Sequence, residues 1–294
     1  MRLFTAFSTF ALALGVSAAA INNTIGGSRR TCGTVLKDDI RLLAESDFSS
    51  KLQLDEDPEF KKSETSKPVT LKVHWNVIAA DKTYKNGYVP KSQIVKNIEA
   101  TNKHYAKSGI RFKLVSVKYT INRDWFNKIS DNSTEEHEAK SKLRKGGPAD
   151  INVYTTGFRS GPDQDTLGYA TFPFKYAAEP KNDGIVILFS TLPGGSKTNL
   201  DQGKTFTHEL GHWLGLYHTF EGGCEGAGDL VNDTPPELEP AYGCEYGRDT
   251  CPGGGKDSIH NFMNYSDDAC LTQFTPGQLK RIKQQIKYYR GVKF

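Results

Sequence analysis

The stretch that decides the fold is His208-Glu-Leu-Gly-His212-Trp-Leu-Gly215-Leu-Tyr-His218. Because His208 and His212 are four residues apart, a helix places both imidazoles on one face, where they can reach the same ion. Gly215 can adopt a positive φ, which ends a helix and lets His218 turn back as a third ligand. Three nitrogen ligands leave one coordination position open, which is typical of a catalytic zinc ion rather than a structural one.

The chemistry expected of this motif is hydrolysis. Neutral imidazoles leave the full charge of one zinc ion, which lowers the pKa of a bound water to about 7 and polarises a carbonyl. Glu209 lies beside the ligands, so it can accept a proton from the attacking water and pass it to the leaving amine. We therefore expect peptide bonds to be hydrolysed by a zinc-bound water that Glu209 activates.

The composition is that of a globular enzyme. The chain has 294 residues, of which 37% are hydrophobic and 24% charged, and its length suits one or two domains. A net charge of +4 is too small and too dispersed to favour nucleic acid as a partner. No stretch after residue 20 is long and apolar enough to span a bilayer. We expect a monomer that acts on protein or peptide substrates, away from membranes.

The N-terminal part of the chain predicts export and processing. Residues 1–20 combine a basic start, an apolar run and small residues, as a cleaved signal peptide does, so the protein is expected outside the cell. Residues 21–67 are polar, with too little apolar material for a core, and are interpreted as a pro-segment. The catalytic domain would occupy 68–294, divided at about residue 218 into an upper and a lower subdomain.

Local patterns predict several elements. Alternating apolar residues indicate a strand from Val69 to Val77, and helical spacing indicates a helix over 92–108. The run Ile185–Phe189 is interpreted as an edge strand on which a substrate peptide adds by main-chain hydrogen bonds. Thr275 followed by Pro276 predicts the start of a C-terminal helix.

A second motif narrows the family. Met263-Asn-Tyr265 lies 45 residues after His218, and the whole pattern resembles the metzincin metalloproteases. The resemblance implies that Met263 packs beneath the metal and that Tyr265 hydrogen-bonds the developing oxyanion. An ordinary core tyrosine is the alternative for Tyr265.

Three further stretches resemble the pappalysin family, and its secreted fungal and bacterial members in particular: Leu167-Gly-Tyr-Ala-Thr-Phe-Pro173, Leu192-Pro-Gly-Gly195 and Asp233-Thr-Pro-Pro-Glu237. The resemblance covers about residues 69–294. It implies an α/β, metzincin-like fold with a twisted, mostly parallel five-stranded sheet, backing helices and an irregular, disulfide-stapled C-terminal subdomain. The active site would lie in the cleft between the subdomains.

The five cysteines divide into a group of four and one other. The group allows three pairings, from which the family resemblance selects Cys224–Cys251 and Cys244–Cys270. Cys32, in Arg30-Thr-Cys32-Gly-Thr34, resembles the family's pro-segment cysteine. Its thiolate would fill the open zinc position and keep a zymogen latent until an activating protease or autoprocessing cuts the chain. A free surface thiol and an intermolecular disulfide are the alternatives.

Three weaker hypotheses complete the analysis. Family resemblance makes calcium a candidate cofactor, with a solvated acidic loop as the alternative; its oxygen ligands would be Asp229, Asn232, Asp233 and Thr234. Asn132 lies in a glycosylation sequon and is the favoured site for a glycan. Asp267 or Asp268 could select a basic side chain after the scissile bond. A peptide-binding module without activity, and a zinc hydrolase of non-peptide bonds, are the rival functions.

Overall fold

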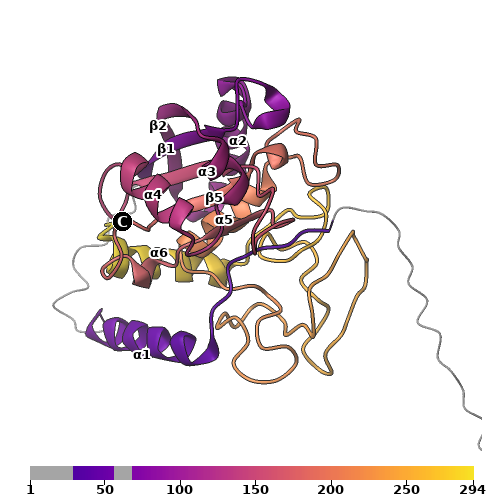
Figure 1. Cartoon of the computed structure of the whole chain (residues 1–294). Helices are drawn as coiled ribbons and strands as arrows, with labels where there is room; N and C mark the ends of the chain where they lie inside the picture. Colours follow the sequence, from indigo (N-terminus) through magenta and orange to yellow (C-terminus); the bar gives the residue numbers. More distant parts are fainter. Residues whose placement is uncertain (1–28, 56–67) are drawn as a thin grey trace, which may run out of the picture.

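The computed structural model describes residues 29–55 and 68–294, so the predicted signal peptide at 1–20 lies outside the described residues. A five-stranded sheet in the order β2-β1-β3-β5-β4 forms its centre (Figure 1). The strands are β1 (Val69–Ala79), β2 (Ile110–Ile121), β3 (Ile151–Thr156), β4 (Gly168–Ala170) and β5 (Ile185–Leu188). All neighbouring strands pair in parallel except β4 and β5, which are antiparallel. The predicted α/β fold with a mostly parallel sheet is confirmed.

The strand order corrects the expected sheet edge. β5 lies between β3 and β4, so the prediction that Ile185–Phe189 forms the edge is wrong. All of β5 is buried, as is usual for an apolar run inside a parallel sheet. The edge beside the histidine motif is β4, whose three residues carry no recognisable alternation.

Helices cover the sheet in two pairs. α2 (Lys91–His104) and α5 (Lys204–Trp213) pack against each other, and the Trp75 ring of β1 meets the Phe206 ring of α5 with centroids 5.2 Å apart. α3 (Arg123–Lys128) and α4 (Thr134–Leu143) form the second pair. Short 3-10 helices occur at Tyr84–Asn86, Ala106–Ser108, Pro173–Lys175 and Phe189–Thr191. Within the described ranges, no helix has the length and apolar character needed to cross a membrane.

Residues 214–275 connect α5 to the C-terminal helix without a strand or helix of their own. Two disulfides hold this region, joining Cys224 to Cys251 and Cys244 to Cys270, which is the pairing implied by the family resemblance. α6 (Pro276–Arg290) follows. Its predicted start is confirmed, because the Thr275 hydroxyl accepts the N–H of Gln278 in a capping box.

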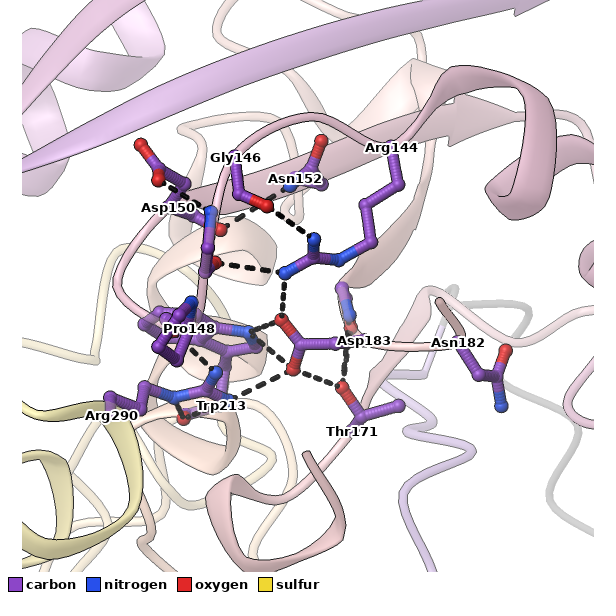
Figure 2. A network of polar contacts seen from close by, with 12 residues as sticks. Arg144, Gly146, Pro148, Asp150, Asn152, Thr171, Asn182, Asp183, Trp213 and Arg290 are labelled. Carbon is purple, nitrogen blue, oxygen red and sulfur yellow. Dashed lines mark hydrogen bonds and ion pairs between the residues drawn. The ribbon is translucent and has the colours of Figure 1, made fainter. Parts of the chain in front are cut away.

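A buried polar network ties α6 to the end of α5 (Figure 2). The Asp183 carboxylate accepts hydrogen bonds of 3.1 Å from the Arg290 guanidinium, the Trp213 indole and the Thr171 hydroxyl. The guanidinium of Arg144 reaches the same carboxylate at 3.4 Å. Arg290 also lies over the Trp213 ring, 3.3 Å from its centroid. Because Trp213 is the last residue of α5, the network fixes the end of the helix that carries two of the histidines.

Residues 29–55, called here the N-terminal segment, consist of an extended stretch followed by α1 (Asp38–Asp55). α1 lies alongside α6 (Figure 1) and buries Ala44 and Phe48. This helix lies within residues that the sequence pattern indicates only as a polar pro-segment. The remainder of the predicted pro-segment, 21–28 and 56–67, lies outside the described residues.

Candidate active site

Three imidazoles converge at the end of α5. The Nε2 atoms of His208 and His212 are 3.2 Å apart, and Nε2 of His212 is 3.1 Å from that of His218. All three side chains are buried. The Sγ of Cys32 comes within 3.5 Å of the His212 Nε2, so the four potential ligand atoms all lie within 4.8 Å of one another.

The donor set fits a tetrahedral zinc ion. The Nδ1 atoms of His208 and His212 lie 2.7 and 2.8 Å from the carbonyl oxygens of Phe262 and Leu216. Because a carbonyl only accepts, these Nδ1 atoms carry the protons and the Nε2 lone pairs point at one another. Zinc–nitrogen bonds of roughly 2.0–2.1 Å at tetrahedral angles separate two nitrogens by about 3.3 Å. Burial, and then the neighbouring histidines, lower the pKa of both imidazoles well below the usual range, so both stay neutral.

Two glycines give the motif its shape. α5 ends at Trp213, and Gly215 has a φ of 102°, which confirms the predicted turn that brings His218 back. Gly211 allows a close approach of Met263, since a Cβ at Gly211 would lie 2.3 Å from the Met263 sulfur. The fully buried Met263 therefore packs directly against the helix beside the imidazoles.

Glu209 faces the N-terminal segment from within the same motif. Its Oε2 accepts hydrogen bonds from the Cys32 thiol at 3.3 Å and from the Thr34 hydroxyl at 3.2 Å. Burial raises the pKa of Glu209 to about 8, and these two hydrogen bonds oppose the rise. Burial, and then the Glu209 carboxylate, raise the pKa of the Cys32 thiol. Glu209 therefore reaches the atom that stands beside the three imidazoles.

Tyr265, which lies in the irregular region 214–275, borders the cluster. Its hydroxyl lies 3.3 Å from the His218 Nε2, accepts the Cys32 N–H at 3.1 Å and donates to the Cys32 carbonyl at 3.4 Å. Burial raises the pKa of Tyr265, so the phenol keeps its proton. The hydroxyl can thus donate a hydrogen bond to a backbone carbonyl that lies in the site.

The N-terminal segment crosses the site as an added strand on β4. The Gly33 N–H donates to the Gly168 carbonyl, and the Leu167 N–H donates to the Thr31 carbonyl, both at 2.9 Å. Cys32 and Gly168 form a parallel bridge. The free edge of the sheet can therefore bind extended peptide backbone next to the imidazoles.

Polar groups around the buried carboxylate of Asp268, called here the Asp268 pocket, hold a guanidinium at the start of α5. Asp268 is completely buried, and one of its oxygens pairs with the guanidinium of Arg30, which is itself 2% exposed. The other oxygen accepts the Gln202 N–H at 2.7 Å. Arg30 also donates to the Thr205 hydroxyl at 3.3 Å and to the Ser266 carbonyl at 3.4 Å. In this structure the Asp268 pocket thus holds one basic side chain, that of Arg30.

The four residues expected to bind calcium are only partly brought together. The Thr234 hydroxyl donates to Asp229 Oδ1 at 2.6 Å, whereas the buried Asp229 Oδ2 has no hydrogen-bond partner among the described residues. Asp233 instead accepts the N–H of Gly277 at the start of α6, at 2.8 Å. Asn232 is exposed.

Two residues of the site were not predicted. Thr34, which bonds Glu209, belongs to the quoted Arg30–Thr34 motif, so that motif could have identified it. Gly211 occupies an unspecified position of the histidine motif, and only its closeness to Met263 reveals why it is a glycine.

Comparisons with known proteins show what this chain is similar to. The peptidase M43 family model, described as pregnancy-associated plasma protein-A, matches residues 150–287. Extracellular metalloprotease 1 of Coccidioides posadasii is 41% identical over 293 residues, covering 96% of this chain and 97% of that protein. Promirolysin of Tannerella forsythia has a TM-score of 0.70 at 24% identity, covering 87% of this chain and 94% of its own. Mature mirolysin with a cleaved peptide has a TM-score of 0.60 at 26% identity, covering 74% and 92%.

Proposed function

This chain belongs to the pappalysin family of metalloendopeptidases, peptidase M43, and on that premise we propose that it is a zinc enzyme secreted as a latent precursor. One observation carries the proposal: the Nε2 atoms of the three histidines lie 3.1–3.2 Å from one another in sequence order, His208 to His212 to His218, with the Glu209 carboxyl in the same buried cluster. The name of the C. posadasii relative, an extracellular metalloprotease, supports secretion. The substrates of the enzyme proposed here are proteins or peptides.

His208, His212 and His218 would hold the ion, which would supply a Lewis acid that polarises the scissile carbonyl and acidifies water. Glu209 accepts one proton from the attacking water as the new C–O bond forms. It then delivers that proton to the nitrogen as the C–N bond breaks, so the proton count balances. Glu209 can do so only after the N-terminal segment leaves, because Cys32 and Thr34 bond its Oε2 in this structure.

Tyr265 stabilises the charge that develops on the carbonyl oxygen. Its hydroxyl keeps its proton and already donates to a backbone carbonyl, that of Cys32. The same donor, aimed at a substrate carbonyl, strengthens as negative charge grows on the oxygen. Met263 supports the histidines from below, as its packing against Gly211 suggests.

The substrate binds along β4 by main-chain hydrogen bonds, in the place that residues 31–34 occupy in this structure. Its side chain next to the scissile bond enters the Asp268 pocket. A basic residue is favoured there, because a buried carboxylate without a cation is costly.

Latency comes from Cys32. Its sulfur stands 3.5 Å from the His212 Nε2, where it would complete the ligand set of a bound zinc ion and exclude water. Removal of the N-terminal segment by an activating protease or by autoprocessing opens the position. The pro-form of mirolysin aligns over 87% of this chain, which supports a common fold for the precursor.

Two accessory features belong to the same proposal. The buried, unpartnered Asp229 Oδ2 beside Thr234 suits a calcium ion, which would brace the loop after the histidine motif. Asn132 is exposed directly before the Ser133 cap of α4, which suits a glycan.

The test of this proposal is hydrolysis of an unfolded protein by the processed enzyme. We expect a chelator to abolish cleavage and added zinc to restore it. We also expect the Cys32→Ser precursor to process itself faster than the wild type, whereas the Cys32→Ser, Glu209→Gln double variant stays intact. Chelator-insensitive cleavage contradicts the metal mechanism. Equal processing rates of the wild-type and Cys32→Ser precursors contradict the proposed inhibition by the Cys32 thiol, called here the thiol lock.

A further inference from the structure

The N-terminal segment contacts the catalytic domain at two separate places. Residues 30–34 lie in the active site, whereas α1 packs against α6 on another side of the histidine motif (Figure 1). Residues 35–37 join the two parts, and Val35 among them is 80% exposed. The second contact therefore involves neither Cys32 nor the Asp268 pocket.

The apolar part of the second contact is centred on Phe48. This ring is 3% exposed and meets the rings of Tyr288 and Tyr289 of α6, with centroids 6.1 and 6.2 Å away. On the far side of the same helix, Leu42 and Leu43 are 68% and 69% exposed. The buried ring of Phe48 thus orients the helix, whereas Leu42 and Leu43 point away from α6.

The polar part is centred on Glu45. Its carboxylate accepts hydrogen bonds from both terminal nitrogens of Arg281 and, at 2.8 Å, from the Tyr217 hydroxyl. The Arg281 guanidinium lies between two rings, 5.3 Å from the centroid of Phe48 and 5.0 Å from that of Tyr217. Arg281 is only 7% exposed. A bidentate, largely buried ion pair of this kind recognises one carboxylate in one position.

Two of the residues that contact α1 also contact the turn that positions His218 or directly precede that histidine. The Nε of Arg281 donates to the Gly215 carbonyl at 2.9 Å, and Tyr217 directly precedes His218. The site for α1 is therefore built on the same turn that positions the third histidine, and it belongs to the catalytic domain rather than to the segment.

We propose that this surface, formed by Tyr217, Arg281, Tyr288 and Tyr289, is a second binding site for the N-terminal segment. It accepts a helix with a carboxylate and an aromatic residue three positions apart, and its occupant is α1. The site keeps residues 29–55 on the enzyme after the chain is cut beyond Asp55, so a single cut there does not release Cys32. This inference rests on the proposed latency and adds a second step to it.

The segment is retained because the connection between its two contacts, residues 30–34 and α1, is short. Only residues 35–37 separate the two contacts. While one contact is bound, the other part of the segment therefore stays near its own site at an effective concentration in the millimolar range. Dissociation then requires both to open together, so weakening α1 speeds the release of the whole segment.

The experiment uses the full chain with a specific protease site inserted between Asp55 and Val69, in a Glu209→Gln background that prevents self-cleavage. After the cut, size-exclusion chromatography follows whether the N-terminal fragment stays with the catalytic domain. We expect it to co-elute, and we expect Phe48→Ala and Glu45→Gln to speed its loss at least about tenfold. Leu43→Ala, which truncates an exposed residue of the same helix, is the matched control.

Immediate loss of the fragment from the parent protein overturns the inference, as does a Phe48→Ala fragment that leaves no faster than the Leu43→Ala one. Because co-elution needs no activity, it is independent of the proposed chemistry. The activity of the cut protein with Glu209 intact tests latency separately: activity despite a retained fragment contradicts the thiol lock but not the second site.

Discussion

The guanidinium of Arg30 forms a buried ion pair with the carboxylate of Asp268, two residues before the Cys32 thiol reaches the imidazole cluster. The segment that covers the active site thus places a basic side chain in an acidic pocket and a sulfur in the ligand position. Under the proposed function, both contacts use groups that the active enzyme needs for substrate. Latency and specificity are therefore expected to share Asp268.

Asp268→Asn should remove the preference for a basic residue after the scissile bond. The amide keeps an oxygen for the Gln202 N–H but loses the charge, so kcat/KM for peptides with arginine there should fall about 100-fold. Peptides with leucine at that position should change little. Profiling cleavage of a peptide library measures both, with Asp267→Asn as control; an unaltered arginine preference in Asp268→Asn contradicts this assignment.

Tyr265→Phe should lower kcat by about 10- to 100-fold with little change in KM, because the lost hydrogen bond is strongest in the transition state. Steady-state kinetics on one peptide gives both constants. A variant with unchanged kcat would make Tyr265 an ordinary core residue, the alternative that the sequence leaves open.

Asp183→Asn should destabilise the catalytic domain strongly. The carboxylate is 1% exposed and balances the buried Arg290, so its loss should cost about 3 kcal/mol. At this size that corresponds to a fall of about 6–10 °C in the melting midpoint. Asp124→Asn, which alters a surface pair of α3, is the control and should shift the midpoint by less than about 2 °C. Equal midpoints for the two variants would show that the network contributes nothing.

His104 should make stability depend on pH. Burial, followed by the charges of Lys204 and Lys103, lowers the pKa of His104 to about 4. The unfolded chain, with a pKa near 6.5, binds the proton more readily, so stability is complete above pH 6.5 and falls as the pH drops towards 4. At pH 5.5 the loss is about 1.4 kcal/mol. The melting midpoints of the wild type and of His104→Gln should converge as the pH falls from 6.5 towards 4. A difference in midpoint that stays constant over this pH range would contradict the assignment.

The histidine cluster can be predicted from the sequence because the features that form it involve residues close together in the chain. Four-residue spacing places His208 and His212 on one helix face, and Gly215 supplies the turn to His218. These features need no knowledge of the rest of the chain. The capped start at Thr275 follows from neighbouring residues in the same way.

The rest depends on contacts between distant parts of the chain. Strand order cannot be read from Ile185–Phe189, since an apolar run suits an interior strand as well as an edge. Among the α1 side chains that the structure describes, the buried apolar ones are Ala44 and Phe48, and the ring partners of Phe48 lie on α6, at the other end of the sequence. The pairing of Arg30 with Asp268 likewise appears only when the segment is folded over the site.

The most direct test of the mechanism compares wild-type and Glu209→Gln enzymes, both freed of the N-terminal segment and loaded with zinc. We predict one zinc ion per chain in each protein. We also predict that kcat/KM on an unfolded protein falls about 1,000-fold in the variant, because the proton acceptor is lost while the ligands remain. A variant that cleaves at the wild-type rate with its zinc in place would contradict the role of Glu209. A zinc-loaded wild type that leaves every protein intact would contradict the peptidase mechanism itself.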